Sequence, residues 1–170
     1  MSFDSQLIDF NKMYDLPVNH TPTNLGLIRL YQLRKTLLDE VVEIDEIIDA
    51  SHKHAALVEY GAKPGEIHLL VAMADLMGDL QVYCGSEMVK WGLPREAVLY
   101  IIMASNMSKL GADGQPIVVD GKVQKGPHYW KPEPLIHELL KWPEAIKDGL
   151  ALNVAKQLVA AKQAELALVA

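Results

Sequence analysis

Cysteine is nearly absent from this chain, which has one, Cys84, among 170 residues. A single cysteine excludes an intrachain disulfide framework and a zinc site built on several cysteines. Aromatic residues are also scarce, at 6%, although half of the sequence is hydrophobic. The apolar residues are therefore mostly aliphatic or Met, which favours helices packed on helices.

Positive charge is also in short supply, since 16 basic and 22 acidic residues leave a formal net charge of -6. Sequence-independent binding of DNA or RNA needs a positive field, so nucleic acid is not an expected partner. A small anionic ligand remains compatible, because a bound metal inverts the local charge. The N-terminus lacks a secretory signal, and polar residues interrupt the longest apolar stretch, 150–170. We expect a cytoplasmic protein without a membrane span.

The hydrophobic pattern predicts five or six helices. Apolar residues recur at helical spacing in one continuous stripe formed by Leu30, Leu33, Leu37, Val41, Ile44 and Ile48. Thr23 or Asn24 can cap this helix, and Gly92 closes the next one. The expected helices cover about 3–14, 24–51, 66–91, 94–110, 134–142 and 144–167, with a break at 61–65.

A segment rich in glycine and lysine interrupts the helices at about 111–131. Ile117–Val119 and Lys122–Gln124 can pair as a short hairpin across Asp120-Gly121, a dipeptide that suits a type I′ turn. The predicted fold class is therefore all-α, a helical bundle with one irregular loop or short β-hairpin.

Carboxylates stand at helical spacing on two of the predicted helices. Asp39, Glu40 and Glu43 share one face of the first, and Asp75 and Asp79 are i,i+4 neighbours on the second. The second helix is apolar almost all round, so we expect it to be buried and its acids to be paired, protonated or bound to metal. Carboxylate oxygens suit Mg²⁺ or Mn²⁺.

Other interpretations of these acids stay open. The first group can be a solvated face paired with Arg34 and Lys35, and Asp75 and Asp79 can belong to a salt bridge. A di-iron site is disfavoured, because the sequence contains no Glu-x-x-His. The six histidines show no shared ligand spacing, and we assign them no metal role.

The segment from Ser105 to Pro132 combines the residue types that bind a polyphosphate. Lysines supply point charges at Lys109, Lys122, Lys125 and Lys131, while Asn106 and Ser108 are neutral donors. Tyr129 and Trp130 can stack on a base. The alternative is a solvated hairpin whose lysines keep an edge strand soluble.

Taken together, the acids on two successive helices, the Ser-Asn-Met-Ser-Lys109 run and the segment from Asp-Gly-Lys122 to Lys-Gly-Pro-His-Tyr129 resemble a known superfamily. It is that of the MazG-like all-α nucleoside triphosphate pyrophosphohydrolases, which includes phosphoribosyl-ATP pyrophosphohydrolases and dimeric dUTPases. The resemblance covers roughly 33–134. It implies one domain over 1–170, with a four-helix core at about 24–134 and a C-terminal extension at about 135–170.

The resemblance also implies a ligand set for Mg²⁺. The family's Glu-Glu-x-x-Glu falls on Asp39, Glu40 and Glu43, and the Asp of its Glu-x-x-Asp falls on Asp79. The Glu of that second motif is replaced by Leu76, and Asp75 can take its place. Expected metal ligands are thus Glu40, Glu43, Asp75 and Asp79.

The expected reaction is hydrolysis of a nucleoside triphosphate to a monophosphate and pyrophosphate. Glu43 or Asp39 would orient the attacking water as general base. The resemblance places the phosphates and nucleoside against Asn106, Lys109, Lys122, Lys125 and Tyr129.

Two further functions stay open at this point. A non-catalytic nucleotide-binding or regulatory protein is favoured by the missing Glu at Leu76. A structural oligomerisation module would leave the acids solvated and bind no Mg²⁺. Self-association is expected, because the apolar surface of helix 66–91 exceeds what one small bundle covers. The resemblance implies a homodimer or homotetramer.

Overall fold

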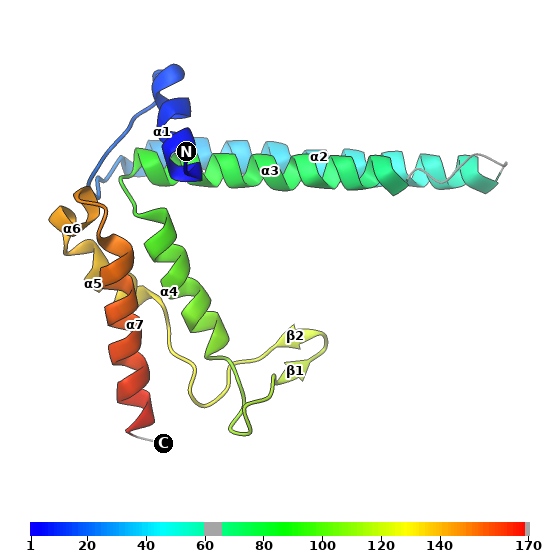
Figure 1. Ribbon diagram of the computed structural model, residues 1–170. Coiled ribbons are helices and arrows are strands. Elements are labelled where there is room, and N and C mark those ends of the chain that lie inside the picture. The colour runs from blue at the N-terminus through cyan, green and yellow to red at the C-terminus, as the bar shows by residue number, and fades with distance from the viewer. Residues whose placement is uncertain (60–65, 169–170) are drawn as a thin grey trace. The chain divides into compact units, whose positions relative to one another are not determined.

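The computed structural model describes residues 1–59 and 66–168 (Figure 1). The predicted break at 61–65 lies outside the described residues. The helices are α1 (Phe3–Met13), α2 (Gly26–Glu59), α3 (Glu66–Lys90), α4 (Arg95–Met107), α5 (Glu133–Leu140), α6 (Pro143–Lys147) and α7 (Ala151–Ala167), and the strands are β1 (Val118–Val119) and β2 (Lys122–Val123). The all-α prediction is confirmed.

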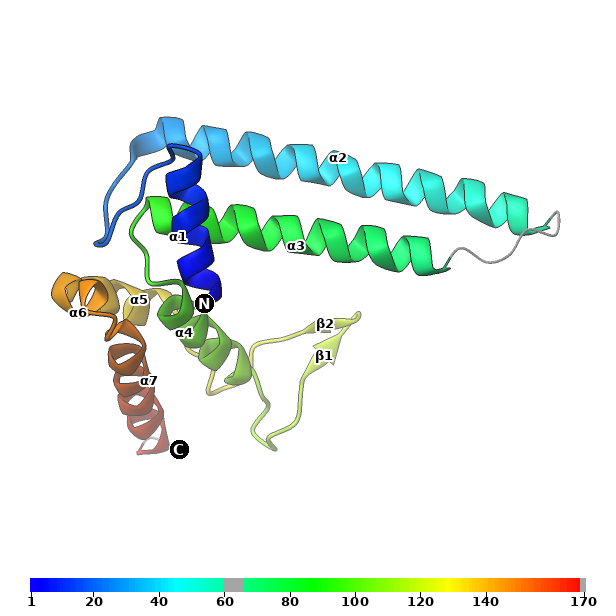
Figure 2. The ribbon, with the colours of Figure 1, turned by 45° about the horizontal axis from the view of Figure 1, so that its top comes forward.

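The chain divides into two compact units, residues 1–15 with 24–87 and residues 16–23 with 88–170. In the first unit α2 and α3 run antiparallel, side by side (Figures 1 and 2). Helix α1 docks on the C-terminal part of α3, where the buried Asn11 side chain donates to the Ser86 carbonyl at 3.2 Å and accepts from Ser86 Oγ at 2.6 Å. Arg29 near the start of α2 pairs with Glu87 of α3.

Helix α2 is longer than its pattern predicted. It begins at Gly26, whose N–H donates to Asn24 Oδ1 at 2.9 Å, and it extends to Glu59 rather than to about 51. The sequence offers neither Gly nor Pro between Gly26 and Gly61, so nothing in that stretch breaks the helix.

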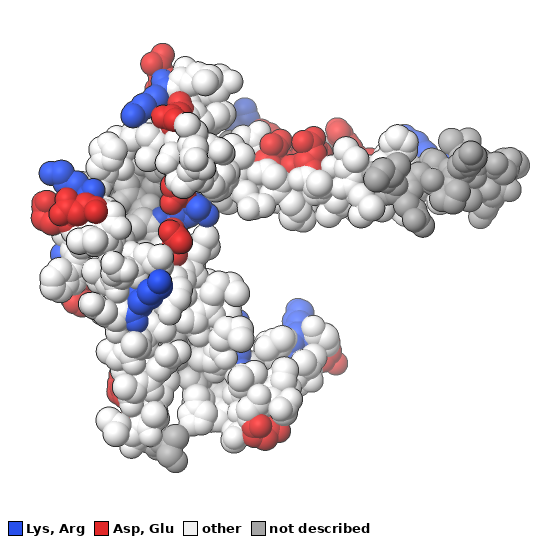
Figure 3. Space-filling model, in the orientation of Figure 1, with Lys and Arg blue, Asp and Glu red and all other residues white. Residues whose placement is uncertain are grey.

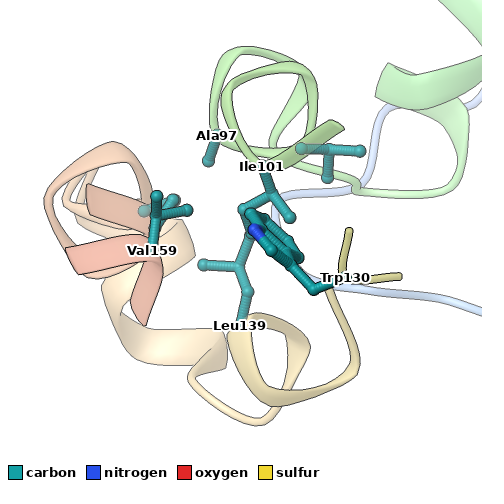
Figure 4. Packing of buried hydrophobic residues seen from close by; sticks show 8 residues of the cluster. Ala97, Ile101, Trp130, Leu139 and Val159 are labelled. Atoms are coloured by element: carbon teal, nitrogen blue, oxygen red, sulfur yellow. The ribbon is translucent and has the colours of Figure 1, made fainter. Parts of the chain in front are cut away.

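The second unit packs around a hydrophobic core built on α4, α5 and α7. Ala97 and Ile101 of α4, Trp130, Leu139 of α5 and Val159 of α7 meet there (Figure 4). The residues of the predicted C-terminal extension thus share a core with α4.

Gly92 ends α3 as predicted, with a φ of +65°. A Cβ at this position would lie 1.9 Å from the carbonyl oxygen of Thr21, in the connector of the same unit. Glycine is therefore required both by the left-handed backbone and by the close approach.

The hairpin is confirmed, with Val118 opposite Val123 and Val119 opposite Lys122. Asp120 and Gly121 have φ values of 49° and 72°, as a type I′ turn demands.

The expected helix over 144–167 is wrong in one respect, because α6 and α7 are separate. Gly149 has a φ of 73°, and the N–H of Leu150 donates back to the Ala145 carbonyl at 2.7 Å, which ends the helix there.

The expectation that α3 is buried is also wrong for the single chain. Its residues Leu69, Leu70, Val71, Met73 and Met77 are exposed, and so are Asp75 and Asp79. The spacing of apolar residues shows which surface of a helix is apolar, but it does not show which other element covers that surface.

No helix in the described part of the chain is long and apolar enough to cross a membrane.

Candidate functional site

Acidic side chains gather along the paired helices α2 and α3 (Figure 3). Glu40 lies at the centre of this group and is only 8% exposed, whereas Asp39 and Asp79 are exposed and Glu43 is half-buried. Glu40 and Glu43 are one turn apart on α2, and Asp79 comes from α3. We call Asp39, Glu40, Glu43 and Asp79 the carboxylate cluster.

Within this cluster, Glu40 has the carboxyl group whose pKa is raised by its surroundings. Burial raises the pKa of its carboxyl group. The negative charge of Glu43, a side-chain hydrogen bond with Glu43, and the negative charges of Asp79 and Asp39 raise that pKa further. No basic side chain is among the described groups that act on it. Its Oε2 atom is buried and, within the described part of the chain, has no hydrogen-bond partner. A buried carboxylate oxygen of this kind lacks a positive counter-charge.

Tyr83 is a member of this site that the sequence analysis missed. Burial raises the pKa of its phenol, and the charges of Glu40, Asp79 and Glu43 add to the effect. Its position four residues after Asp79 on α3 was a usable signal, because i,i+4 residues share a helix face.

Asp75 and Leu76 differ from the other residues at this part of α3. Asp75 is exposed and is not among the groups that act on Glu40. Leu76, at the position of the expected Glu, is 1% exposed and belongs to the hydrophobic interior. The structure therefore brings together four of the five predicted carboxylates.

The carboxylate cluster has the donor chemistry of a site for a hard divalent cation, because all its ligand atoms are oxygens. The unpartnered Oε2 of Glu40 fits this assignment, since a cation would supply the missing counter-charge. In the arrangement described, no group of three or more His, Cys, Asp or Glu side chains among the described residues is set up to hold an ion.

The predicted phosphate-binding residues lie in the second unit. The Nζ of Lys125 is 4.7 Å and that of Lys109 5.9 Å from the centroid of the Tyr129 ring. Both ammonium groups therefore lie within cation–π range of one aromatic ring. We call Lys109, Lys125 and Tyr129 the lysine–tyrosine cluster.

Three other residues that were predicted to bind phosphate lie outside the lysine–tyrosine cluster. Asn106 is exposed in the last turn of α4, and Lys122 is exposed in β2. Ser108, expected as a donor to phosphate, donates its hydroxyl to the Ser105 carbonyl at 2.7 Å instead.

No family model and no curated protein matches this chain. Among solved structures, it is similar to a proposed NTP pyrophosphohydrolase from Exiguobacterium sp. 255-15, with 25% sequence identity, 81% of this chain and 93% of that chain covered, and a TM-score of 0.41. This likeness is too distant for residue roles to be transferred from it.

Proposed function

We propose that the chain is a Mg²⁺-dependent pyrophosphohydrolase that converts a nucleoside triphosphate to the monophosphate and pyrophosphate. The observation that carries the proposal is the buried Glu40 carboxylate, which lacks a partner for Oε2 and is surrounded by other acids. Electrostatic strain of this kind is typical of functional sites, where stability is sacrificed to hold a ligand.

In this proposal Glu40, Glu43 and Asp79 hold the metal, and Asp75 is a further candidate ligand. Bound Mg²⁺ would neutralise phosphate charge and lower the pKa of a coordinated water. Asp39 or Glu43 would accept a proton from the attacking water; Asp39 is the more accessible of the two, since it is exposed and Glu43 half-buried.

The lysine–tyrosine cluster, within the second unit, is the proposed binding site for the phosphate chain. Lys109 and Lys125 would bind the phosphate chain and stabilise the leaving pyrophosphate, and Asn106 and Lys122 would add outer contacts. Both ammonium groups lie within cation–π range of the Tyr129 ring, and two positive charges at one ring suit a ligand carrying several negative charges.

Release of pyrophosphate tests the proposed function directly. Canonical, deoxy and modified nucleoside triphosphates are incubated with the chain and Mg²⁺, and pyrophosphate and monophosphate are quantified with EDTA as the control. We expect equimolar pyrophosphate and monophosphate from at least one substrate, and none with EDTA. Release of inorganic phosphate and diphosphate instead would contradict the proposed bond cleavage.

A non-catalytic nucleotide-binding protein is the second candidate. It is favoured by Leu76, whose buried side chain removes one oxygen ligand from the expected set. The same assay separates the two, because a binding protein gives nucleotide-induced thermal stabilisation without pyrophosphate.

We also propose that the chain self-associates through α2 and α3. A shallow groove of about 320 Å³ runs along α2 and is almost wholly apolar, lined by Leu30, Leu33, Arg34, Leu37, Leu38 and Val41. Exposed apolar residues continue along α3. Exposed apolar residues in this number are typical of an interface, and a second copy of the chain offers the same surface in return.

Leu38→Lys tests this assembly, because Leu38 lines the groove and is 44% exposed. A lysine there would place a charge in the apolar interface, which costs several kcal/mol. We expect light scattering after size exclusion to show at least a dimer for the wild type at micromolar concentration and a monomer for the variant. Ala50→Lys adds the same charge to an exposed site on α2 and should stay associated. A monomeric wild type would overturn the proposal.

A further inference from the structure

Two serine hydroxyls join the end of α4 to the chain that follows the lysine–tyrosine cluster. Ser105 is 2% exposed, and its Oγ donates to the Trp130 carbonyl at 2.7 Å. Ser108 Oγ accepts from the Trp130 N–H at 3.3 Å and donates to the Ser105 carbonyl at 2.7 Å. The backbone N–H and the carbonyl of Trp130 are therefore both bound by serine hydroxyls at the end of α4, from Ser105 in its last turn and from the C-cap Ser108, and the Trp130 ring is buried in the core (Figure 4).

A second contact that closes the same loop joins Leu110 to Gly126. A Cβ on Gly126 would be 1.7 Å from the Leu110 carbonyl oxygen, so the two backbones touch. The Tyr129 N–H donates to the Gly126 carbonyl at 3.2 Å, which ties the tyrosine to this contact. The loop thus leaves α4 next to Lys109 and returns to the same place with Lys125 and Tyr129.

These closures bring two lysines to one aromatic ring. Lys109 and Lys125 come from opposite ends of the loop, and their ammonium groups lie within 5.9 Å and 4.7 Å of one ring centroid. On a free loop the two flexible side chains would sample many positions away from the ring. Fixed backbone anchors limit that freedom and preorganise both lysines for an anion.

We propose that Ser105 and Ser108 are positioning residues whose hydroxyls, by fixing the Trp130 peptide, hold Tyr129, Lys109 and Lys125 together as a preformed site for a phosphate chain. This inference rests on the proposed function for its ligand class, and it assigns the serines a role in binding without contact with the substrate. The hydroxyl of Ser108 is engaged by the backbone on both sides, so its effect on a ligand passes through Trp130 and Tyr129.

Ser108→Ala tests the inference, with Ser108→Thr as the variant that keeps the hydroxyl. Three quantities are measured: the ring-current shift of the Lys125 ε-methylene by NMR, the Kd for inorganic tripolyphosphate without metal, and KM and kcat for the nucleotide. We expect Ser108→Ala to lose most of the upfield shift, to raise Kd and KM about fivefold to tenfold, and to change kcat less than about twofold. Ser108→Thr should restore all three, and Ser105→Ala should repeat the loss.

Ser51→Ala is the matched control, because Ser51 Oγ donates to the Ile47 carbonyl at 2.8 Å in α2 and makes the same kind of helical back-bond outside the loop. If Ser108→Ala lowers the melting temperature but leaves the Lys125 shift and the tripolyphosphate Kd unchanged, the serines are structural only and the inference is overturned. If no nucleotide is hydrolysed while the shift and Kd respond as expected, the proposed function fails and the positioning role stands.

Discussion

Glu40→Gln is expected to reduce Mg²⁺-dependent hydrolysis while stabilising the metal-free protein. Loss of even an outer-shell partner of a metal site costs about 10–100-fold, so loss of a ligand should lower kcat/KM by at least about 100-fold. In the absence of metal, the substitution removes a buried charge that has no partner for Oε2 and is repelled by Glu43, Asp79 and Asp39. The melting temperature in EDTA should therefore rise.

The pH dependence of stability gives this prediction a second measurement. The folded state raises the pKa of Glu40, so between the usual glutamate pKa and the raised value the folded chain binds more protons than the unfolded chain. Stability of the metal-free wild type should then fall as pH rises through that window. The glutamine side chain of the variant cannot titrate, and denaturant unfolding in EDTA across pH should show a smaller decrease in its stability.

Glu46→Gln provides the control for both measurements. It makes the same chemical change on an exposed side chain of α2 that is not among the groups acting on Glu40. Activity, melting temperature and pH dependence should match the wild type. If Glu40→Gln retains more than about half of the wild-type kcat/KM, Glu40 has no part in holding a metal and the proposed function loses its main support.

Local sequence signals placed most of the helices and the hairpin. Gly92 and the Asp120-Gly121 pair act through backbone φ values of +65°, 49° and 72°, and such requirements are visible in the sequence itself. The separation of α6 from α7 depends on Gly149, which a helical pattern can also tolerate in its interior. Helical periodicity shows that a face is apolar but not which element covers it, and for this reason the exposure of α3 was missed.

The acidic residues were predicted from spacing, but their different environments were not. Helical periodicity puts Glu40 and Glu43 on neighbouring positions, whereas only the fold shows that Glu40 is the buried one and interacts with Asp79 and Tyr83 of α3. The role of Ser108 was misjudged for a related reason. A serine hydroxyl near lysines is equally suited to phosphate and to backbone, and only the fold shows that Ser105 and Trp130 occupy it.

The second large effect is expected from Lys109→Gln combined with Lys125→Gln. A hydrogen bond to a charged group contributes about 1.5–3 kcal/mol, so each lysine in contact with phosphate should contribute about tenfold or more to binding. The double variant should raise KM for the nucleotide by at least about tenfold. Because contacts made equally in ground and transition states act on KM, kcat should fall much less.

Salt separates this charge effect from a general loss of structure. Wild-type KM should rise with ionic strength as the attraction between lysines and phosphate is screened, and the double variant should show a much weaker dependence. Lys147→Gln removes one positive charge from an exposed site on α6 and should leave KM and its salt dependence unchanged.

The lysine–tyrosine cluster also predicts how the effects of Lys109→Gln and Lys125→Gln on KM combine. Since both ammonium groups lie over the Tyr129 ring, they should bind one phosphate chain jointly, and their separate effects on log KM should not add. Strictly additive effects would mean that Lys109 and Lys125 contact separate ligands, and an unchanged KM in the double variant would remove both from substrate binding.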